Sequence, residues 1–221
     1  MRPLKYIKIF KAFTLAEVLI TLGIIGVVAA LTIPTLVKNY QKTQTVTQLK
    51  KAYTTLAQAV KQSEIANGNC ADWDWGTDGD AASIRQSFDT LWAPYLRISN
   101  FCTTLGECGY SNGINNLAGA GANGVVSPTT RTTLVLSDGT VLIIWVSIKA
   151  IVVDINAGKR PNIYGKDVFY FILDASKGLM PTGYNLSTNT VNNDCSTSGT
   201  GYYCASKIMR DGWEMKSDYP W

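Results

Sequence analysis

The sequence predicts an α+β protein, in which a long N-terminal helix packs on an antiparallel β-meander and a loop-rich C-terminal region follows. Three observations lead to this prediction. The residues from Val18 to Val37 are uncharged. An apolar stripe with helical spacing continues beyond them, and the second half of the chain contains apolar runs separated by turn residues. A long helix followed by a run of strands is typical of an α+β fold.

The first half of the helix is suited to a membrane. The twenty uncharged residues from Val18 to Val37 would span about 30 Å as a helix, which is the thickness of the hydrocarbon core of a bilayer. Residues 1–12 contain four basic side chains and no acidic one, and a basic flank of this kind stays in the cytoplasm. We therefore expect a single-pass topology with a cytoplasmic N-terminus and a translocated domain.

Three interpretations of this segment are open. It is a secretory signal cut near Val28-Ala29-Ala30, an uncut anchor, or an apolar helix that is kept after a cut between Ala12 and Phe13. Glu17 bears on the choice, because a carboxylate carried to the membrane centre costs about 2.5–3.5 kcal/mol. A cut before Phe13 would create a positively charged amine one helical turn from Glu17 and so provide a partner for this carboxylate.

Residues 11–20, with the sequence KAFTLAEVLI, resemble the class III signal of type IV prepilins and type II secretion pseudopilins. The resemblance implies that a prepilin peptidase cuts between Ala12 and Phe13 and methylates the new amine. Glu17 would then be the fifth mature residue and Pro34 the twenty-second, which are the family's positions for the assembly glutamate and a common proline. The family usually has glycine before the cut, where this chain has Ala12.

The same resemblance implies a pilin fold and a structural function. The expected organisation is a leader (residues 1–12), a transmembrane and polymerisation helix (13–36) and a globular domain (37–221). The expected function is that of a type II secretion pseudopilin assembled in the bacterial inner membrane. A type IV pilus subunit for adhesion, motility or DNA uptake and a non-polymerising, membrane-anchored binding domain are the alternatives. The domain would be periplasmic, or extracellular in a filament, and the partners would be further copies, minor pilins, the peptidase and an inner-membrane assembly platform.

Composition excludes some classes of function. The chain has 20 basic and 16 acidic residues, and its entire positive excess lies in residues 1–12, so the mature chain is formally neutral and nucleic-acid binding is not indicated. The chain has no histidine, which excludes Ser-His and Cys-His nucleophile pairs. We therefore expect no enzymatic activity.

The second half of the helix is predicted to pack on the domain's own sheet, and Pro34 is expected to kink or loosen the helix between the two halves. Apolar residues recur beyond Pro34 with alternating spacings of three and four, which places them on one helical face. They are Val46, Leu49, Tyr53, Leu56 and Val60.

The sheet is predicted from apolar runs in the second half of the chain. Residues 132–136 and 141–146 flank Asp138-Gly139, and an Asp-Gly pair between apolar runs indicates a β-hairpin. Residues 150–155 and 168–173 are expected to form two further strands. Residues 91–96 are expected to close a short helix or turn, and residues 182–201, rich in Gly, Ser, Thr and Asn, an exposed loop.

Five cysteines suit an exported chain in an oxidising compartment. Cys102 and Cys108 bracket a short turn, as do Cys195 and Cys204, and we expect these two disulfides with Cys70 left free. Two alternatives remain open, namely that Cys70 competes for a partner or that the thiols are reduced and buried. The resemblance adds that a C-terminal disulfide is frequent in the pilin family.

Oxygen ligands gather between the last two predicted strands. Asp154, Asn156, Asn162 and Asp167 lie in a Gly-containing loop, and oxygen is the ligand type that calcium takes. The resemblance adds that major pseudopilins bind calcium in a late loop. The alternative is that these residues form turns, since Asp and Asn are frequent turn residues. A second acidic cluster, Asp72, Asp74, Asp78 and Asp80, is interleaved with Trp73 and Trp75 and is better explained as a solvated loop with two packing tryptophans.

Overall fold

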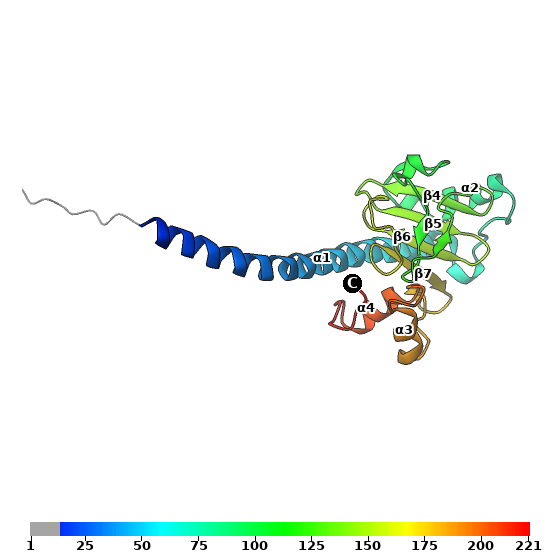
Figure 1. The fold of residues 1–221 in the computed structure, drawn as a ribbon. Helices are drawn as coiled ribbons and strands as arrows, with labels where there is room; N and C mark the ends of the chain where they lie inside the picture. The colour runs from blue at the N-terminus through cyan, green and yellow to red at the C-terminus, as the bar shows by residue number, and fades with distance from the viewer. Residues whose placement is uncertain (1–13) are drawn as a thin grey trace, which may run out of the picture. The chain divides into compact units, whose positions relative to one another are not determined.

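The computed structural model describes residues 14–221, so the predicted leader and the predicted cut between Ala12 and Phe13 lie outside the described residues. The chain has the predicted α+β composition, with a long N-terminal helix and a six-stranded antiparallel sheet (Figure 1). It divides into two compact units, residues 1–41 and residues 42–221.

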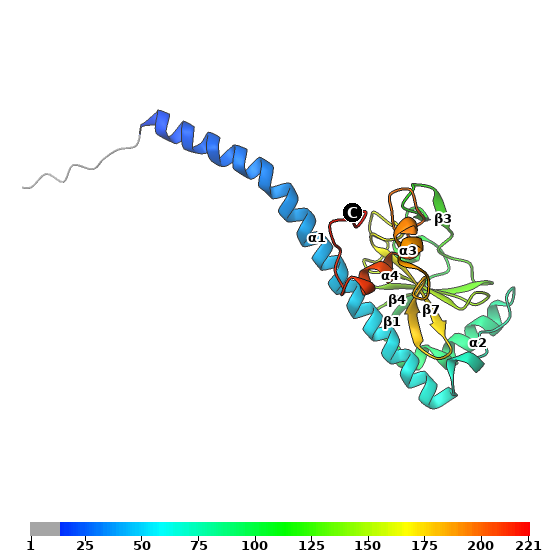
Figure 2. The ribbon, with the colours of Figure 1, turned by 90° about the horizontal axis from the view of Figure 1, so that it is seen from below.

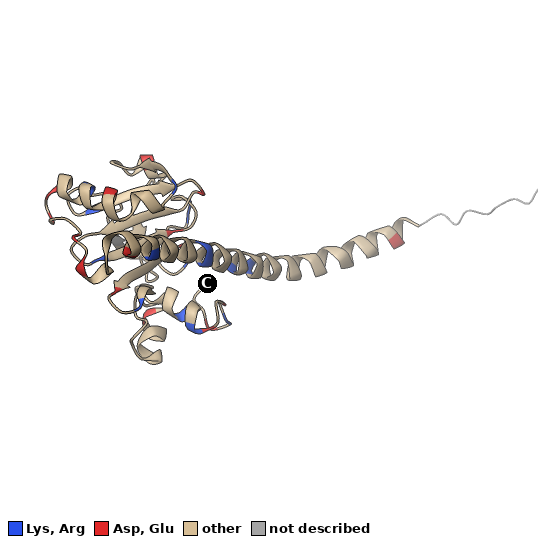
Figure 3. Cartoon of the chain, turned by 180° about the vertical axis from the view of Figure 1, so that it is seen from behind, with Lys and Arg blue, Asp and Glu red and all other residues tan. Residues whose placement is uncertain are grey.

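Helix α1 (Leu15–Asn67) runs without interruption through Pro34. From residue 14 to residue 41 every described side chain is exposed except Ala29, which is half-buried. In Figure 3 the helix carries neither blue nor red from the turn after Glu17 as far as Val37, and Lys38 is the next charged residue. By length and composition α1 is long and apolar enough to cross a membrane, which agrees with the predicted apolar segment.

The sheet of the second unit has the strand order β1-β4-β5-β6-β7-β8, and every neighbouring pair is antiparallel. The four predicted strands are confirmed as β4 to β7, and β1 and β8 add two edges. The bounds are β1 (Ile98–Phe101), β4 (Arg131–Leu136), β5 (Val141–Trp145), β6 (Ala150–Asp154), β7 (Val168–Asp174) and β8 (Gly178–Pro181).

The Asp-Gly hairpin forms between β4 and β5 as predicted. Gly139 adopts a positive φ of 88°, which costs glycine little because it has no Cβ. The backbone N–H of Leu136 donates to the carbonyl of Thr140 at 2.8 Å. The N–H of Thr140 donates to Asp138 Oδ1 at 3.1 Å, so the side chain completes the turn.

One face of the sheet packs on the second half of α1, as the apolar stripe predicts (Figure 2). Leu49 and Leu56 are fully buried, and each contributes about 1.5–3 kcal/mol to folding. Tyr53 is half-buried, with its ring centroid 5.8 Å from that of Phe171 and 5.3 Å from that of Trp213. The helix is therefore part of the domain's core from about residue 45 onward.

The opposite face of the sheet has its own apolar cluster, which includes Tyr110, Ile114 and Val125 from the segment before β4. This segment also forms the short strands β2 (Ile114–Asn115) and β3 (Gly121–Asn123). Strands covered on both faces are expected to be continuously apolar rather than alternating. The runs in β5 and β6 show this pattern.

The prediction of a loop at residues 182–201 is wrong in part, because this segment contains α3 (Thr188–Asp194). Ser187 caps this helix by accepting from the N–H of Thr190 at 3.2 Å, and Val191 anchors it in the protein interior. A helix of two turns with one apolar anchor has too little periodicity to be recognised. The short helix or turn predicted at residues 91–96 is confirmed, because α2 (Ala81–Leu91) ends there and the 3₁₀ turn η2 (Ala93–Tyr95) follows it. The structure adds one further α-helix, α4 (Cys204–Arg210), and two 3₁₀ turns, η1 (Cys70–Asp72) and η3 (Gly106–Cys108).

The acidic, tryptophan-containing segment is structural. Trp73 and Trp75 are buried, and both ring centroids lie about 6 Å from that of Trp92. Asp80 caps α2 by accepting from the N–H of Ala82, and Asp74 accepts from the N–H of Gly76 in a turn. The segment is thus a capped loop whose tryptophans pack in the core.

Candidate functional site

The first turn of α1 is closed by a reciprocal pair of side chains. The backbone N–H and the hydroxyl of Thr14 donate to Glu17 Oε2 at 2.9 and 2.8 Å. The N–H of Glu17 donates in turn to Thr14 Oγ1 at 3.2 Å. This is a capping box, which supplies partners to N–H groups that the helix itself leaves unpaired.

The cap gives Glu17 a local partner that we did not predict. The pattern Thr14-Leu15-Ala16-Glu17 is a recognisable capping-box signal, and it precedes the apolar run directly. Capping of its own helix is compatible with the expected pairing of Glu17 with an amine, because among residues 14–221 no donor reaches the second carboxylate oxygen, Oε1.

The remaining predicted assembly residue, Pro34, lies inside α1 and is exposed like its neighbours. A Cβ built on Gly23 or Gly26 would meet no atom within 4 Å, so both glycines leave room for close approach of another helix. Glu17 and Pro34 therefore lie on one continuous helix whose side chains have no cover from the described residues of their own unit.

Both predicted disulfides form, Cys102–Cys108 and Cys195–Cys204. The second ties α3 to the start of α4, and Cys204 lies in the main core. Disulfides are a feature of exported proteins. The pairing of the four cysteines agrees with a domain that folds outside the cytoplasm.

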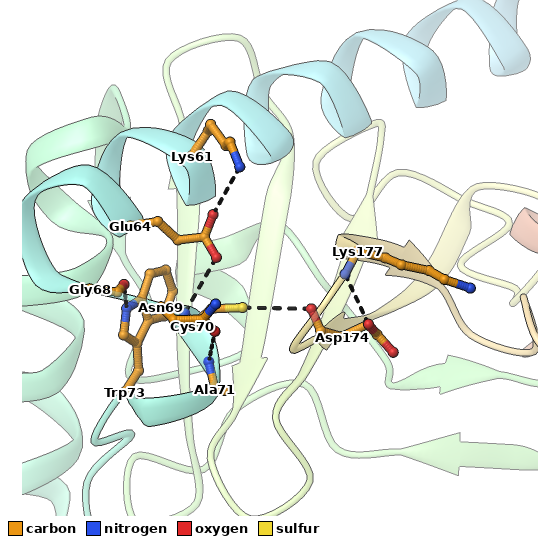
Figure 4. Close-up of polar contacts among 9 residues, drawn as sticks. All are labelled: Lys61, Glu64, Gly68, Asn69, Cys70, Ala71, Trp73, Asp174 and Lys177. Carbon is orange, nitrogen blue, oxygen red and sulfur yellow. Dashed lines mark hydrogen bonds and ion pairs between the residues drawn. The ribbon is translucent and has the colours of Figure 1, made fainter.

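Cys70 is the free cysteine, and it is buried at the start of η1, just after α1. Figure 4 shows its thiol directed at the carbonyl of Asp174, 3.7 Å away, while its backbone N–H donates to Glu64 at 3.4 Å. Burial, together with the neighbouring Glu64, raises the pKa of the Cys70 thiol to about 11. Because the thiolate is the reactive form, Cys70 is an inert core residue at neutral pH.

The four predicted calcium ligands do come together, but as a closed hydrogen-bond network. Asp154 Oδ1 accepts from the N–H of Asn156 at 2.9 Å, and its Oδ2 accepts from the N–H of Gly158 at 3.2 Å and from the Tyr110 hydroxyl. Asp167 Oδ2 accepts from Asn156 Nδ2 at 3.0 Å. Asp167 Oδ2 also accepts from the N–H of Asn162 at 2.8 Å, and Asp167 Oδ1 accepts from the N–H of Ile163 at 2.8 Å.

This network fits calcium poorly. All four carboxylate oxygens already face N–H or O–H donors, which a cation would have to displace. Within residues 14–221 only the amide oxygens of Asn156 and Asn162 are buried without a donor in this group, whereas calcium takes roughly six to eight oxygens. The described residues also contain no group of three or more His, Cys, Asp or Glu side chains placed to hold a metal ion. Calcium binding here stays a prediction that the geometry disfavours.

We therefore expect calcium to leave the stability of the domain unchanged. Adding about 5 mM calcium, which exceeds the dissociation constants of most weak protein sites, should not move the thermal midpoint of the full chain in detergent. Magnesium at the same concentration is the control for ionic strength. A rise in midpoint that is specific to calcium and lost in Asp167→Asn would contradict this expectation.

Burial governs the protonation of the network. Asp154 is fully buried, and burial together with the nearby Asp167 raises the pKa of Asp154 to about 7. Burial also raises the pKa of Asp167. The pKa of Tyr110 is raised by its burial and by Asp154, so its hydroxyl remains a donor. Among the described residues neither carboxylate forms an ion pair.

The network fastens two segments that are distant in sequence. Tyr110 follows the Cys102–Cys108 loop, whereas Asp154 ends β6. A Cβ on Gly158 would lie 2.8 Å from the carbonyl carbon of Gly109, so the two backbones touch here, and the absence of a side chain permits this contact. Tyr110 was not predicted, and nothing in the local sequence links it to Asp154.

No curated protein and no solved structure matches the chain. One family model does match, over residues 35–221, which include the second half of α1 and the whole sheet and begin directly after Pro34. The match covers most of the chain. The protein therefore belongs to DUF6613, a family of unknown function.

Proposed function

We propose that this protein is a subunit of a pilin-like filament, anchored by α1 in a membrane before assembly. The observation that carries the proposal is the two-part helix. Its first half has exposed, uncharged side chains after a single carboxylate in the first turn, and its second half is built into the core of a disulfide-containing domain.

Physical chemistry supports this function in two steps. Exposed apolar side chains over residues 18–37 must be covered by lipid or by other helices, because a large uncovered apolar surface marks an interaction site. A carboxylate at the edge of that surface needs a partner of opposite charge when it is buried. A register in which the amine of one mature chain meets Glu17 of the next satisfies both requirements.

Two filaments are candidates. The sequence favours the type II secretion pseudopilus through the oxygen-rich loop between β6 and β7. Most of that support is lost, because the carboxylates of this loop already accept hydrogen bonds within the chain. The surface type IV pilus is favoured by the Cys195–Cys204 disulfide, which staples the C-terminal region. The non-polymerising anchored domain gives no use to Glu17 beyond capping its own helix.

Deleting the gene and complementing it with wild type or Glu17→Gln separates these functions. Sheared surface material would be examined by electron microscopy, and secreted proteins would be compared between strains. Filaments containing this chain indicate the surface pilus, and loss of exoprotein secretion without surface filaments indicates the pseudopilus. If wild-type chains give neither result and do not cross-link to one another in membranes, the filament proposal fails.

A further inference from the structure

A groove lies at the outer edge of the sheet, between α1 and the hairpin of β7 and β8. Its volume is about 750 Å³, which is within the usual range for ligand sites. One wall is formed by α1 between Tyr53 and Glu64, and the other by the turn and edge strand from Ala175 to Leu179. The groove therefore lies wholly within the second unit, apart from the apolar half of α1.

The edge strand β8 presents a backbone donor to this groove. The N–H of Thr182 donates to the carbonyl of Tyr170 in β7 at 3.0 Å. Because residues that bond to the partner strand alternate along an antiparallel pair, Leu179 and Pro181 face away from β7. The Tyr53 hydroxyl donates to the Leu179 carbonyl at 3.3 Å, and the Leu179 N–H is left for an added strand. Pro181 has no N–H, which limits such a strand to the end of β8 nearest the turn.

Two ammonium groups flank the groove, one from each wall. Lys61 comes from α1 and Lys177 from the turn between β7 and β8 (Figure 4). Lys61 pairs with Glu64 at 3.4 Å, but its side chain is 80% exposed, and an exposed pair of this kind is weak. Among the described residues that line the groove, Glu64 is the only carboxylate, and it already accepts from Lys61 and from the N–H of Cys70. The charges therefore favour a negatively charged occupant.

The floor of the groove between the two lysines is apolar, because Val60 and Leu179 are buried there. A Cβ built on Gly178 would meet no atom within 4 Å, so the space beside the strand edge is open. Successive side chains of an extended segment point to opposite sides. A segment that alternates acidic and apolar residues would therefore turn its carboxylates to the lysines and its apolar side chains to the floor.

We propose that this groove is a docking site for an extended, acidic segment of a partner protein, which adds to the free edge of β8. Strand addition is a general mode of peptide recognition, in which the main chain provides affinity and alternate side chains provide specificity. The proposal goes beyond the filament function and does not depend on it, because no residue of the apolar half of α1 lines the groove.

The test uses the mature full-length chain in detergent and a displayed library of random short peptides. Enriched peptides are synthesised with a fluorophore, and their binding is measured by anisotropy. Lys61→Glu reverses one charge of the groove, and Gln58→Trp fills the groove from an exposed position of α1. Lys159→Glu is the matched control, because Lys159 is an exposed lysine of the loop between β6 and β7 that does not line the groove.

We expect the enriched peptides to carry Asp or Glu at alternate positions and to bind the wild type and Lys159→Glu equally. Lys61→Glu should weaken binding about tenfold, since it replaces an attraction by a repulsion, and Gln58→Trp should abolish binding. Added salt should weaken binding to the wild type, because it screens exposed charges. Equal thermal midpoints of the variants show that the fold is kept.

Three results would overturn the proposal. The first is that no peptide is enriched, or that the enriched peptides are basic or uncharged. The second is that Lys61→Glu and Gln58→Trp bind the peptides as well as the wild type does. The third is that polygalacturonate binds more tightly than any peptide and loses its binding in the same two variants, which would assign the groove to an acidic polysaccharide instead.

Discussion

Glu17→Gln is expected to insert into the membrane and to be cut before Phe13 like the wild type, and then to fail in self-assembly. The substitution keeps the capping-box pattern with Thr14, so the helix end remains intact. What is lost is the negative charge that, in the proposed filament, would meet the ammonium group of a neighbouring chain. Leaving one member of a buried charge pair without its partner costs about 3–5 kcal/mol, which corresponds to a hundredfold or greater loss in each subunit contact.

The measurement is the yield of this chain in sheared or membrane-cross-linked polymer, normalised to the mature chain in the membrane. Asp89→Asn provides a matched control, because Asp89 is a half-exposed helix carboxylate of the second unit, paired with Arg85 at 2.9 Å. This control should assemble normally. Wild-type polymer yield from Glu17→Gln would show that the carboxylate serves only its own helix.

The second large effect concerns pH. The free energy of unfolding is expected to fall between about pH 4 and pH 7 through Asp154, whose pKa lies near 3.9 in an unfolded chain and is raised to about 7 in the folded one. Between these two pKa values Asp154 is protonated in the native state and ionised in the unfolded chain. The stability that this proton gives the native state is therefore lost as the pH rises. The effect is on the order of 4 kcal/mol, and the raised pKa of Asp167 acts in the same direction.

Urea unfolding followed by tryptophan fluorescence, from pH 4 to pH 8, measures this effect on the full chain in detergent. Asp154→Asn removes the ionisable group at this position. The hydrogen bond lost in the variant changes the free energy of unfolding by the same amount at every pH. The difference in stability between wild type and variant should therefore decline steadily with pH. A difference that grows with pH would contradict the buried, protonated carboxylate.

Asp138→Asn is the control of opposite sign. Burial acts to raise the pKa of Asp138, but the 2.8 Å ion pair with Lys51 and the hydrogen bond from Thr140 outweigh it and hold the pKa below its usual value. Asp138 therefore contributes stability above its unfolded pKa and loses that contribution on acidification. Asp138→Asn should therefore have a lower free energy of unfolding than the wild type at pH 7. At the acidic end of the pH range the two free energies of unfolding should be equal.

Elements with a clear period or turn signal were predictable from the sequence. The stripe that contains Leu49 and Leu56 identifies the face of α1 that is buried, because a helix brings residues three and four apart to one side. Asp138-Gly139 identifies the hairpin, because glycine accepts the positive φ that this turn needs. The cysteine pairs followed from short loops that bring both thiols together. All three depend on residues close in sequence.

Contacts between distant residues were not predictable in the same way. The hydrogen bond from Tyr110 to Asp154 joins a loop near the disulfide to the end of β6, and only the folded sheet brings the two together. The oxygen-rich loop was correctly seen as a gathering of carboxylates and amides, but composition does not reveal whether oxygens face a cation or N–H groups. The capping box of Thr14 and Glu17 is local, and its four-residue pattern alone is sufficient to predict it.

The central claim is that α1 is kept on the mature chain and presents a new ammonium group near Glu17. Mass spectrometry of the N-terminal peptide of the chain isolated from membranes tests it most directly. We predict a mature chain that begins with an N-methylated Phe13. A chain that begins at Met1 would mean an uncut anchor, and a chain that begins at Leu31 would mean a cleaved secretory signal, and either result would contradict the account.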